Sequence, residues 1–312
     1  MHPDAAARWS LIAAVGTMAA WGMNFAFVKY VLDQLGVGAF MFIRFAVLPL
    51  LGLALLALVF RSRRIAQTWP RRADLPRFAL CALVGHVLHI SAVMYGMNLS
   101  TAFSSSLVLT CQPLFTLAIL AWLGGERLRR RQVAGTLVAF TGIVLFLADK
   151  FAAGFSRAGL GDLTLLIAGA AFSAYTVLAR PLADRYGPLI VLSYTLLFSM
   201  PLMLAVTFPF FGDLKLASLG PTVWAALLWA LVVCSFLGWL LWTWVNSVRG
   251  VARSAPFMYL MPPVAGVMAW LTLGETFTWL KILGAAITMG GVAWAQFGGG
   301  PPPKEAGQPD AA

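Results

Sequence analysis

The chain alternates long apolar runs with short polar stretches along almost its whole length of 312 residues. Most runs hold 17 to 25 residues, and about 20 are enough for a helix to cross roughly 30 Å of hydrocarbon. Only 11% of the residues are charged, whereas a soluble domain has about 25%. The pattern predicts an all-α integral membrane protein.

Ten transmembrane helices follow when the apolar runs are read between charge clusters and Gly or Pro breaks. They are 9–31, 38–60, 76–98, 101–123, 132–148, 162–180, 188–208, 222–246, 254–272 and 279–297. The stretch GGGPPPKEAGQPDAA (298–312) is rich in Pro and Gly and predicts a disordered cytoplasmic tail.

The basic residues predict the orientation of these spans. With the N-terminus inside, sixteen of the 22 Lys and Arg residues fall in cytoplasmic segments and five in outer loops. Such a bias marks the cytoplasmic side, so both termini of a ten-span chain are expected there. Because the basic clusters lie between spans rather than on a basic arm, the net charge of +11 does not indicate a nucleic-acid partner.

The two halves of the chain resemble each other. An offset of 151 pairs AAWGMNFAFVKYVLDQLG (19–36) with AAFSAYTVLARPLADRYG (170–187). An offset of 149 pairs further positions, namely Ser105/Ser254, Pro113/Pro262, Gly125-Glu126/Gly274-Glu275, Gly135/Gly284 and Gly142/Gly291. We therefore expect a five-helix unit (1–150) and a second copy (151–297). Because five is odd, the second copy is inverted in the membrane, an arrangement typical of secondary transporters.

Several segments resemble paired EamA domains of the drug/metabolite transporter (DMT) superfamily. They are WGMNFAFVK, FIRFAVLPL, the stretch from STAFSSSLVLT to FTGIVLF (100–146) and the stretch from RSAPFMYLMPP to GGVAW (253–294). The resemblance covers nearly the whole chain before the tail and implies a 5+5 inverted repeat. In it, spans 1, 3, 4, 6, 8 and 9 surround a central cavity. It also implies small-molecule transport, commonly export of amino acids or other metabolites across the bacterial inner membrane.

Polar and aromatic side chains in those six spans are the candidates for substrate contact. Polar groups at mid-membrane depth are costly unless they face a cavity or a partner. The predicted substrate-binding residues are Trp21, Asn24, His86, His89, Thr110, Tyr175, Trp239 and Tyr259. Asn24 favours the cavity because its amide cannot satisfy itself on its own helix, whereas Thr110 fits cavity and helix packing equally well. Tyr175 and Tyr259 are the repeat partners of Asn24 and Thr110.

A second group is expected to act in gating or structure. Pro113 and Pro262 each remove a backbone donor, so they are expected to kink their helices beside the cavity. Glu126 and Glu275 follow matched glycines, and capping the positive end of the next helix is favoured over substrate contact. For Arg44, one or two turns into the second span, a structural ion pair with Asp33 is favoured over ligand binding.

His86 and His89 lie one turn apart on one face of the third span, in CALVGHVLHISAVMYG (81–96). Two roles are possible for them: a neutral pair that only stabilises the structure, or side chains that line the substrate path. No metal or cofactor site is predicted, because the third histidine is His2 and no buried carboxylate completes a ligand set. No Asp or Glu lies centrally in a predicted span. Proton coupling through the histidines therefore stays open.

These features predict a secondary transporter that exports small neutral or zwitterionic organic metabolites, such as amino acids, across the inner membrane. A carrier of sugar-type or nucleoside-type solutes or of drugs is the alternative within this class. A non-transport membrane subunit is the alternative outside it. An enzyme would need a nucleophile–base pair or a metal set within the bilayer, and the sequence offers neither. The oligomeric state is not indicated.

Overall fold

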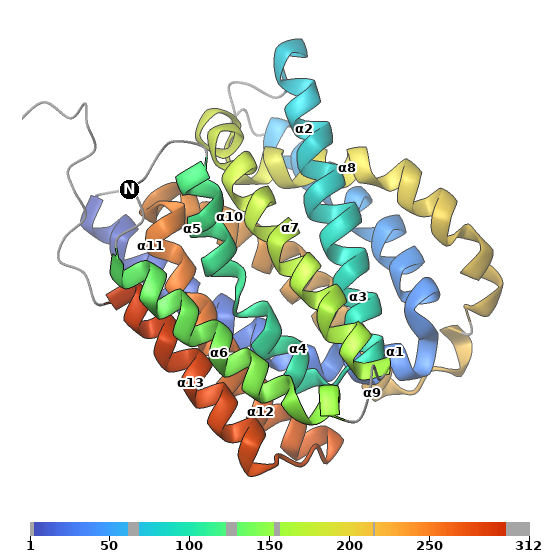
Figure 1. The fold of residues 1–312 in the computed structure, drawn as a ribbon. Coiled ribbons are helices and arrows are strands. Elements are labelled where there is room, and N and C mark those ends of the chain that lie inside the picture. Colours follow the sequence, from blue (N-terminus) through green and yellow to red (C-terminus); the bar gives the residue numbers. More distant parts are fainter. Residues whose placement is uncertain (1–2, 62–68, 123–129, 153–156, 215, 298–312) are drawn as a thin grey trace, which may run out of the picture.

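The computed structural model describes residues 3–61, 69–122, 130–152, 157–214 and 216–297. These residues form a bundle of helices (Figure 1), and they include no strand. Within them, six helical stretches are long and apolar enough to cross a membrane: Ala6–Leu58, Arg72–Leu99, Ala102–Trp122, Ala158–Tyr186, Pro188–Asp213 and Pro221–Arg249. The chain is thus an all-helical, multi-pass membrane protein. The predicted tail, 298–312, lies outside the described residues.

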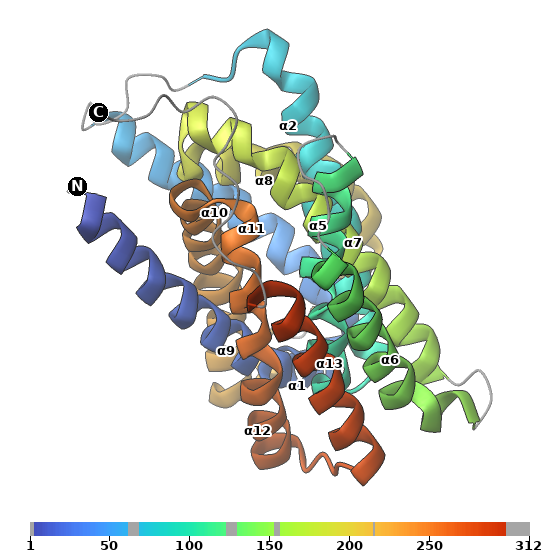
Figure 2. The ribbon, with the colours of Figure 1, turned by 60° about the vertical axis from the view of Figure 1, so that its left-hand side comes forward.

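Glycines with positive φ separate helices at matched places in the two halves. α1 (Pro3–Arg61) holds the first two predicted spans and departs from helical geometry at Gly36, where φ is 72° and ψ 164°. The parts of α1 before and after this residue run in different directions (Figure 2). Gly187, with φ 83°, separates α7 (Arg157–Tyr186) from α8 (Pro188–Thr207) in the same way. A side chain with a Cβ rarely adopts this conformation.

Two long helical stretches contain a π-helical segment. They are η2 (Ala82–His89), between α2 (Leu75–Cys81) and α3 (Ile90–Leu99), and η5 (Trp229–Leu237), between α9 (Pro221–Leu228) and α10 (Gly238–Arg249). π-Helical turns are rare and often occur at functional sites. Here one lies in each half of the chain.

The fourth and ninth predicted spans are interrupted. α4 (Ala102–Leu109) ends before α5 (Gln112–Trp122) begins, and α11 (Val251–Ser254) and the 3₁₀ helix η6 (Ala255–Leu260) precede α12 (Met261–Leu273). Pro113 and Pro262 are the second residues of α5 and α12. Each proline thus directly follows a break in the regular α-helix, and a hinge role for the two stays a prediction. Proline suits this position because a first-turn N–H has no partner within the helix.

α6 (Arg130–Ala152) and α13 (Trp279–Phe297) lie side by side (Figures 1 and 2). Glycines allow this close approach. A Cβ on Gly284 would lie 2.6 Å from the Phe146 nitrogen, and one on Gly291 would lie 2.9 Å from the Gly135 oxygen. Small residues at a helix interface bring two backbones together in the same way in other membrane proteins. The short 3₁₀ helices η1 (Arg72–Asp74), η3 (Phe208–Asp213) and η4 (Leu216–Ser218) complete the described elements.

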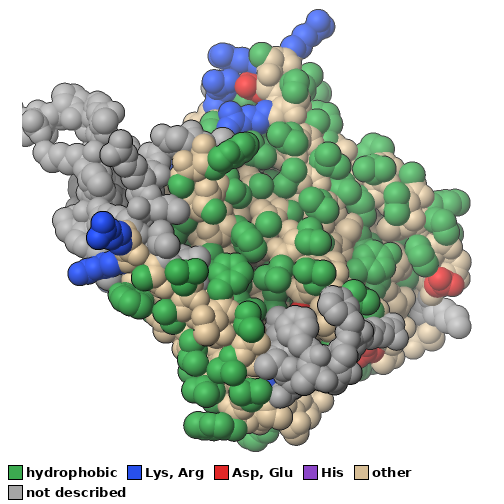
Figure 3. Space-filling view, viewed as in Figure 1, with side chains coloured by type: hydrophobic (Ala, Val, Ile, Leu, Met, Phe, Trp, Pro, Cys, Tyr) green, Lys and Arg blue, Asp and Glu red, His purple; other side chains and the backbone are tan. Residues whose placement is uncertain are grey.

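The exterior is apolar over most of the flank seen in Figure 3, and Lys and Arg gather at the end where α2 begins. Large side chains such as Trp122 and Trp279 are 85% and 75% exposed. Apolar surface of this extent marks contact with lipid or with a partner.

Candidate functional site

A cavity of about 90 Å³ lies inside the bundle, and helices from both halves of the chain line it. Its wall is mainly apolar. Six of the polar and aromatic residues on it are Trp21, Asn24, Arg44, His89, Gln112 and Trp239. Among the described residues, no Asp or Glu lines it. The cavity therefore offers hydrogen-bonding groups and one permanent positive charge inside an apolar shell.

Trp21, Phe172 and Trp239 form an aromatic wall of the cavity. The Phe172 ring meets both tryptophans edge-on, with centroid distances of 5.9 Å to Trp21 and 5.3 Å to Trp239. The indole Nε1 of Trp21 donates to the Cys234 carbonyl of η5 at 2.9 Å. The structure thus places the predicted residues Trp21 and Trp239 on the cavity wall, and their contact with a substrate stays a prediction.

His89 is the histidine of η2 that lines the cavity. Its Nδ1 donates to the Ala168 carbonyl of α7 at 2.9 Å. A carbonyl only accepts, so this bond fixes the proton of the neutral ring on Nδ1 and leaves Nε2 as an acceptor. The ring centroid lies 4.8 Å from that of Phe172.

His86 lies in the packed interior beside the cavity rather than on its wall. It is 0% exposed, and its Nε2 lies 3.0 Å from Thr195 Oγ1 of α8. Thr195 Oγ1 itself donates to the Val191 carbonyl at 2.8 Å, so it accepts a hydrogen bond from the Nε2–H of His86. The His86 ring stacks on Trp239, with centroids 4.5 Å apart. For this residue the geometry favours the structural role.

Arg44 does not form the ion pair with Asp33 that the sequence led us to expect. Asp33 is exposed and is not its partner. Arg44 is 2% exposed, lines the cavity and donates from Nη1 to Ser235 Oγ of η5. Within the part of the chain that the structure describes, its Nε and Nη2 have no hydrogen-bond partner. The second span is not among the spans expected around the cavity, whereas Arg44, in the part of α1 after Gly36, contacts Ser235 of η5 and reaches the interior.

Three predicted substrate-binding residues lie in packed surroundings. Thr110 is 0% exposed and donates to the Leu107 carbonyl of its own turn. Of the two roles left open for it, cavity contact and helix packing, this geometry favours helix packing. Tyr175 is 2% exposed, with its ring 4.9 Å from Trp239 and 5.7 Å from His86. Tyr259 packs with Leu114 and Ala139. None of the three lines the cavity.

Glu275 caps a helix, although not the one that follows it in the chain. Its carboxylate accepts from the backbone N–H groups of Ala102, at 2.7 Å, and Phe103, at 3.4 Å. These donors belong to the first turn of α4, where a negative charge is favourable. Glu126 lies outside the described residues.

Some residues at the site were not predicted. Gln112, Phe172 and Ser235 line the cavity. Gln112 could have been predicted from the sequence by the argument used for Asn24, because a side-chain amide in the middle of a span favours a place at the cavity. Asp162 was not predicted either. It is 1% exposed and accepts from Ser100 Oγ at 2.5 Å and Ser104 Oγ at 2.9 Å.

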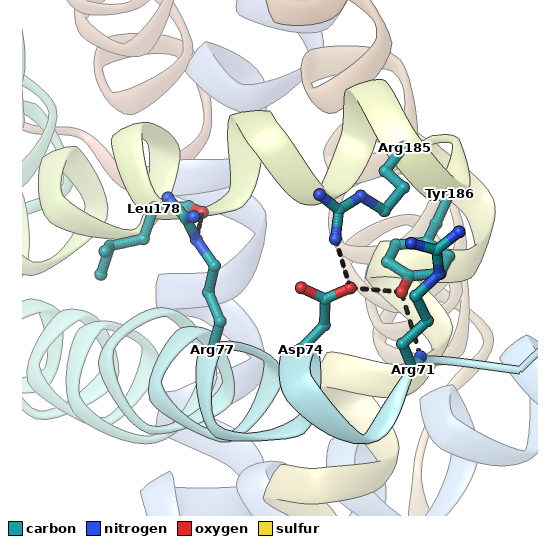
Figure 4. A network of polar contacts seen from close by, with 6 residues as sticks. All are labelled: Arg71, Asp74, Arg77, Leu178, Arg185 and Tyr186. Atoms are coloured by element: carbon teal, nitrogen blue, oxygen red, sulfur yellow. Dashed lines mark hydrogen bonds and ion pairs between the residues drawn. The ribbon is translucent and has the colours of Figure 1, made fainter.

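A second polar cluster joins α7 to the beginning of α2 (Figure 4). The Asp74 carboxylate accepts from Arg185 Nη1 at 2.6 Å and from the Tyr186 hydroxyl at 2.5 Å. The same hydroxyl accepts from the Arg71 backbone N–H at 3.0 Å, and Arg77 Nε donates to the Leu178 carbonyl at 2.9 Å. These bonds fasten α2 to α7 at one end of the bundle.

Comparison with known proteins connects this architecture to transport. The EamA-like transporter family matches residues 8–148 and 159–296. A probable terminal-alkyne amino-acid exporter of Streptantibioticus cattleyicolor is 30% identical, with 92% of each chain covered. A probable amino-acid metabolite efflux pump of Salmonella typhimurium is 28% identical, with 89% of this chain and 91% of the relative covered.

The fold also has a counterpart among solved structures. One crystal structure superposes with a TM-score of 0.65, at 18% identity, and covers 92% of this chain and 96% of that chain. At this identity the likeness concerns the fold alone. The two family matches together span most of the sequence, and the chain belongs to the EamA-like transporter family of the drug/metabolite transporter superfamily.

Proposed function

We propose that this transporter exports small neutral or zwitterionic organic solutes, such as amino acids, across the inner membrane by alternating access. The observation that carries the proposal is the cavity between the two halves. It combines aromatic surface with Arg44, Asn24 and His89. Binding sites for small molecules are typically such apolar hollows with a few polar groups. The names of the two amino-acid exporters among the relatives agree with this solute class.

The proposed architecture is a 5+5 inverted repeat of residues 1–150 and 151–297. Matched contacts across the halves support it. Arg44 and Thr195 are 151 positions apart, and His86 and Ser235 are 149 apart, which are the two offsets of the sequence repeat. Arg44 bonds to Ser235 as Thr195 bonds to His86. Equivalent helices therefore meet equivalent partners, which is what a pseudo-twofold relation between the halves requires.

The polar clusters on α7 suggest where the path opens and closes. Asp162 lies near the start of α7 and Arg185 near its end, about 35 Å apart at 1.5 Å per residue. One cluster ties α7 to Ser100 and Ser104, and the other ties it to Asp74. In alternating access the contacts of one cluster break while those of the other stay formed. The cavity then opens to one side of the membrane at a time.

Counterflow in proteoliposomes tests this function. Vesicles preloaded with unlabelled solute are expected to accumulate the labelled solute transiently, with L-propargylglycine, L-leucine, D-glucose and uridine as the panel. Uptake of the amino acids only would support the proposal. Uptake of glucose or uridine only would favour the sugar or nucleoside alternative. Exchange of no solute, in protein that is folded and inserted, would favour a non-transport subunit.

A further inference from the structure

Arg44 is a buried cation, and only part of its guanidinium group is hydrogen-bonded to the described residues. It is 2% exposed, and its Nη1 is bonded to Ser235 Oγ. Within the described ranges of the chain, Nε and Nη2 have no hydrogen-bond partner. Among the described residues, no carboxylate lines the cavity that Arg44 faces. An uncompensated charge in the interior is costly, and inside a membrane such a group commonly serves a ligand.

The two free donors have the geometry that carboxylates require. Nε–H and the adjacent Nη2–H point in parallel along one edge of the planar guanidinium and match the two oxygens of a carboxylate. Ser235 accepts from Nη1, and Nε and Nη2 on the other edge are buried and have no partner among the described residues. One positive charge balances one negative charge, which favours a carboxylate over a phosphate monoester that carries close to two.

We propose that Arg44 binds the carboxylate of the transported solute through Nε and Nη2, so that transport requires a free, singly charged carboxylate. The proposal rests on the proposed function and names the chemical group that the cavity selects.

The rest of the wall suits the other end of an α-amino acid. The Asn24 side-chain oxygen is buried and has no hydrogen-bond partner among the described residues, which leaves an acceptor for an ammonium group. The faces of Trp21 and Trp239 attract a cation as well. The cavity volume of about 90 Å³ is well above the roughly 10–15 Å³ that a cavity needs to hold one water, so the cavity has room for a small solute.

The test compares L-propargylglycine with its carboxamide, which keeps the ammonium group and the side chain but has lost the negative charge. Binding is measured by thermal stabilisation of the full chain in detergent, and exchange by counterflow. Both are done at about pH 6, where the α-amino groups are protonated. We expect the wild-type protein to need at least about 30-fold more amide than acid, the lower end of the effect of losing one partner of a buried charge pair.

Arg44→Gln is expected to weaken acid binding about 30-fold and to leave amide binding unchanged, so that the preference disappears. Arg44→Lys keeps the charge without the planar fork and is expected to retain only part of the preference. Arg61→Gln is the matched control, because Arg61 is an exposed arginine at the end of the same helix. It is expected to behave as the wild type does.

Each outcome decides the proposal. Equal binding of acid and amide by the wild-type protein overturns it, even if Arg44→Gln fails to fold. An Arg44→Gln protein that keeps the preference for the acid overturns it as well. Preferential binding of the acid without exchange upholds the role of Arg44 but overturns the proposed transport function. If neither compound binds, both the proposed amino-acid substrate and the proposed carboxylate site at Arg44 are overturned.

Discussion

Two imidazoles one turn apart in η2 meet different surroundings. His86 is enclosed by Thr195 and Trp239, whereas His89 reaches the cavity wall and is fixed by the Ala168 carbonyl. The spacing of the two residues predicts that they share a helix face. It does not predict which one meets the cavity, because the neighbours come from α7, α8 and α10. These helices are distant in the sequence.

Exchanging each histidine for phenylalanine separates the two roles. His89→Phe removes the Nε2 acceptor from the cavity and is expected to raise the apparent KM for L-propargylglycine about tenfold, roughly the contribution of one hydrogen bond. His86→Phe keeps an aromatic ring against Trp239 and loses the bond to Thr195. We expect a KM within about twofold of the wild type and a free energy of unfolding lower by about 1 kcal/mol.

Counterflow kinetics and thermal unfolding in detergent check this pair. Equal changes of KM in the two variants would show that the geometry does not distinguish the histidines.

Helix ends follow from the sequence where glycine or proline determines the backbone. Gly36 and Gly187 mark the ends of spans because their positive φ suits no other residue as well. The π-helical segments ALVGHVLH and WALVVCSFL carry no such signal. Apart from His86, His89 and Ser235 they are largely apolar, like the rest of their spans, and where a helix widens depends on its packing against neighbouring helices. For the same reason the sequence did not reveal that α1 brings Arg44 to the cavity.

The contact of α6 with α13 offers a matched pair of substitutions on one helix. A Cβ at Gly291 would approach Gly135 to 2.9 Å, whereas one at Gly290 would meet nothing within 4 Å. Gly291→Ala is expected to lower the free energy of unfolding by about 1–3 kcal/mol through overpacking. Gly290→Ala is expected to be neutral or stabilising by up to about 1 kcal/mol, because alanine is the better helix former.

The two midpoints of thermal unfolding, measured in the same detergent, give the comparison. A Gly291→Ala protein as stable as Gly290→Ala would contradict the close packing of these helices.

At the scale of the whole molecule, charge distribution predicts how the bundle sits in the membrane. Basic side chains gather at the end where α2 begins (Figure 3), as the positive-inside bias leads us to expect of a cytoplasmic end. The general pattern of many spans could be read from the apolar runs alone. The cavity could not, because its wall combines α1, η2, α3, α4, α5, α7, η5, α10 and α12 and depends on how the halves pack.

Labelling of single added cysteines tests the inverted arrangement. Cys81, Cys111 and Cys234 are buried and free, so the native background is expected to react little. Arg72 and Asp213 are both exposed and follow the second helix of their respective halves.

With a membrane-impermeant maleimide, Arg72→Cys is expected to react only in inverted vesicles and Asp213→Cys only in intact cells. The unsubstituted protein serves as the blank. Reaction of both from one side would mean that the halves share one orientation.

The placement of the tryptophans gives the bundle an optical reporter. Trp21 and Trp239 line the cavity, whereas Trp122, Trp270 and Trp279 face outward with 85%, 62% and 75% of their surface exposed. Brominated lipids quench emission from indoles that they can touch. We therefore expect them to dim the outer tryptophans and spare the two inner ones. A solute that enters the cavity then shifts the remaining fluorescence, and occupancy can be followed without attaching a dye.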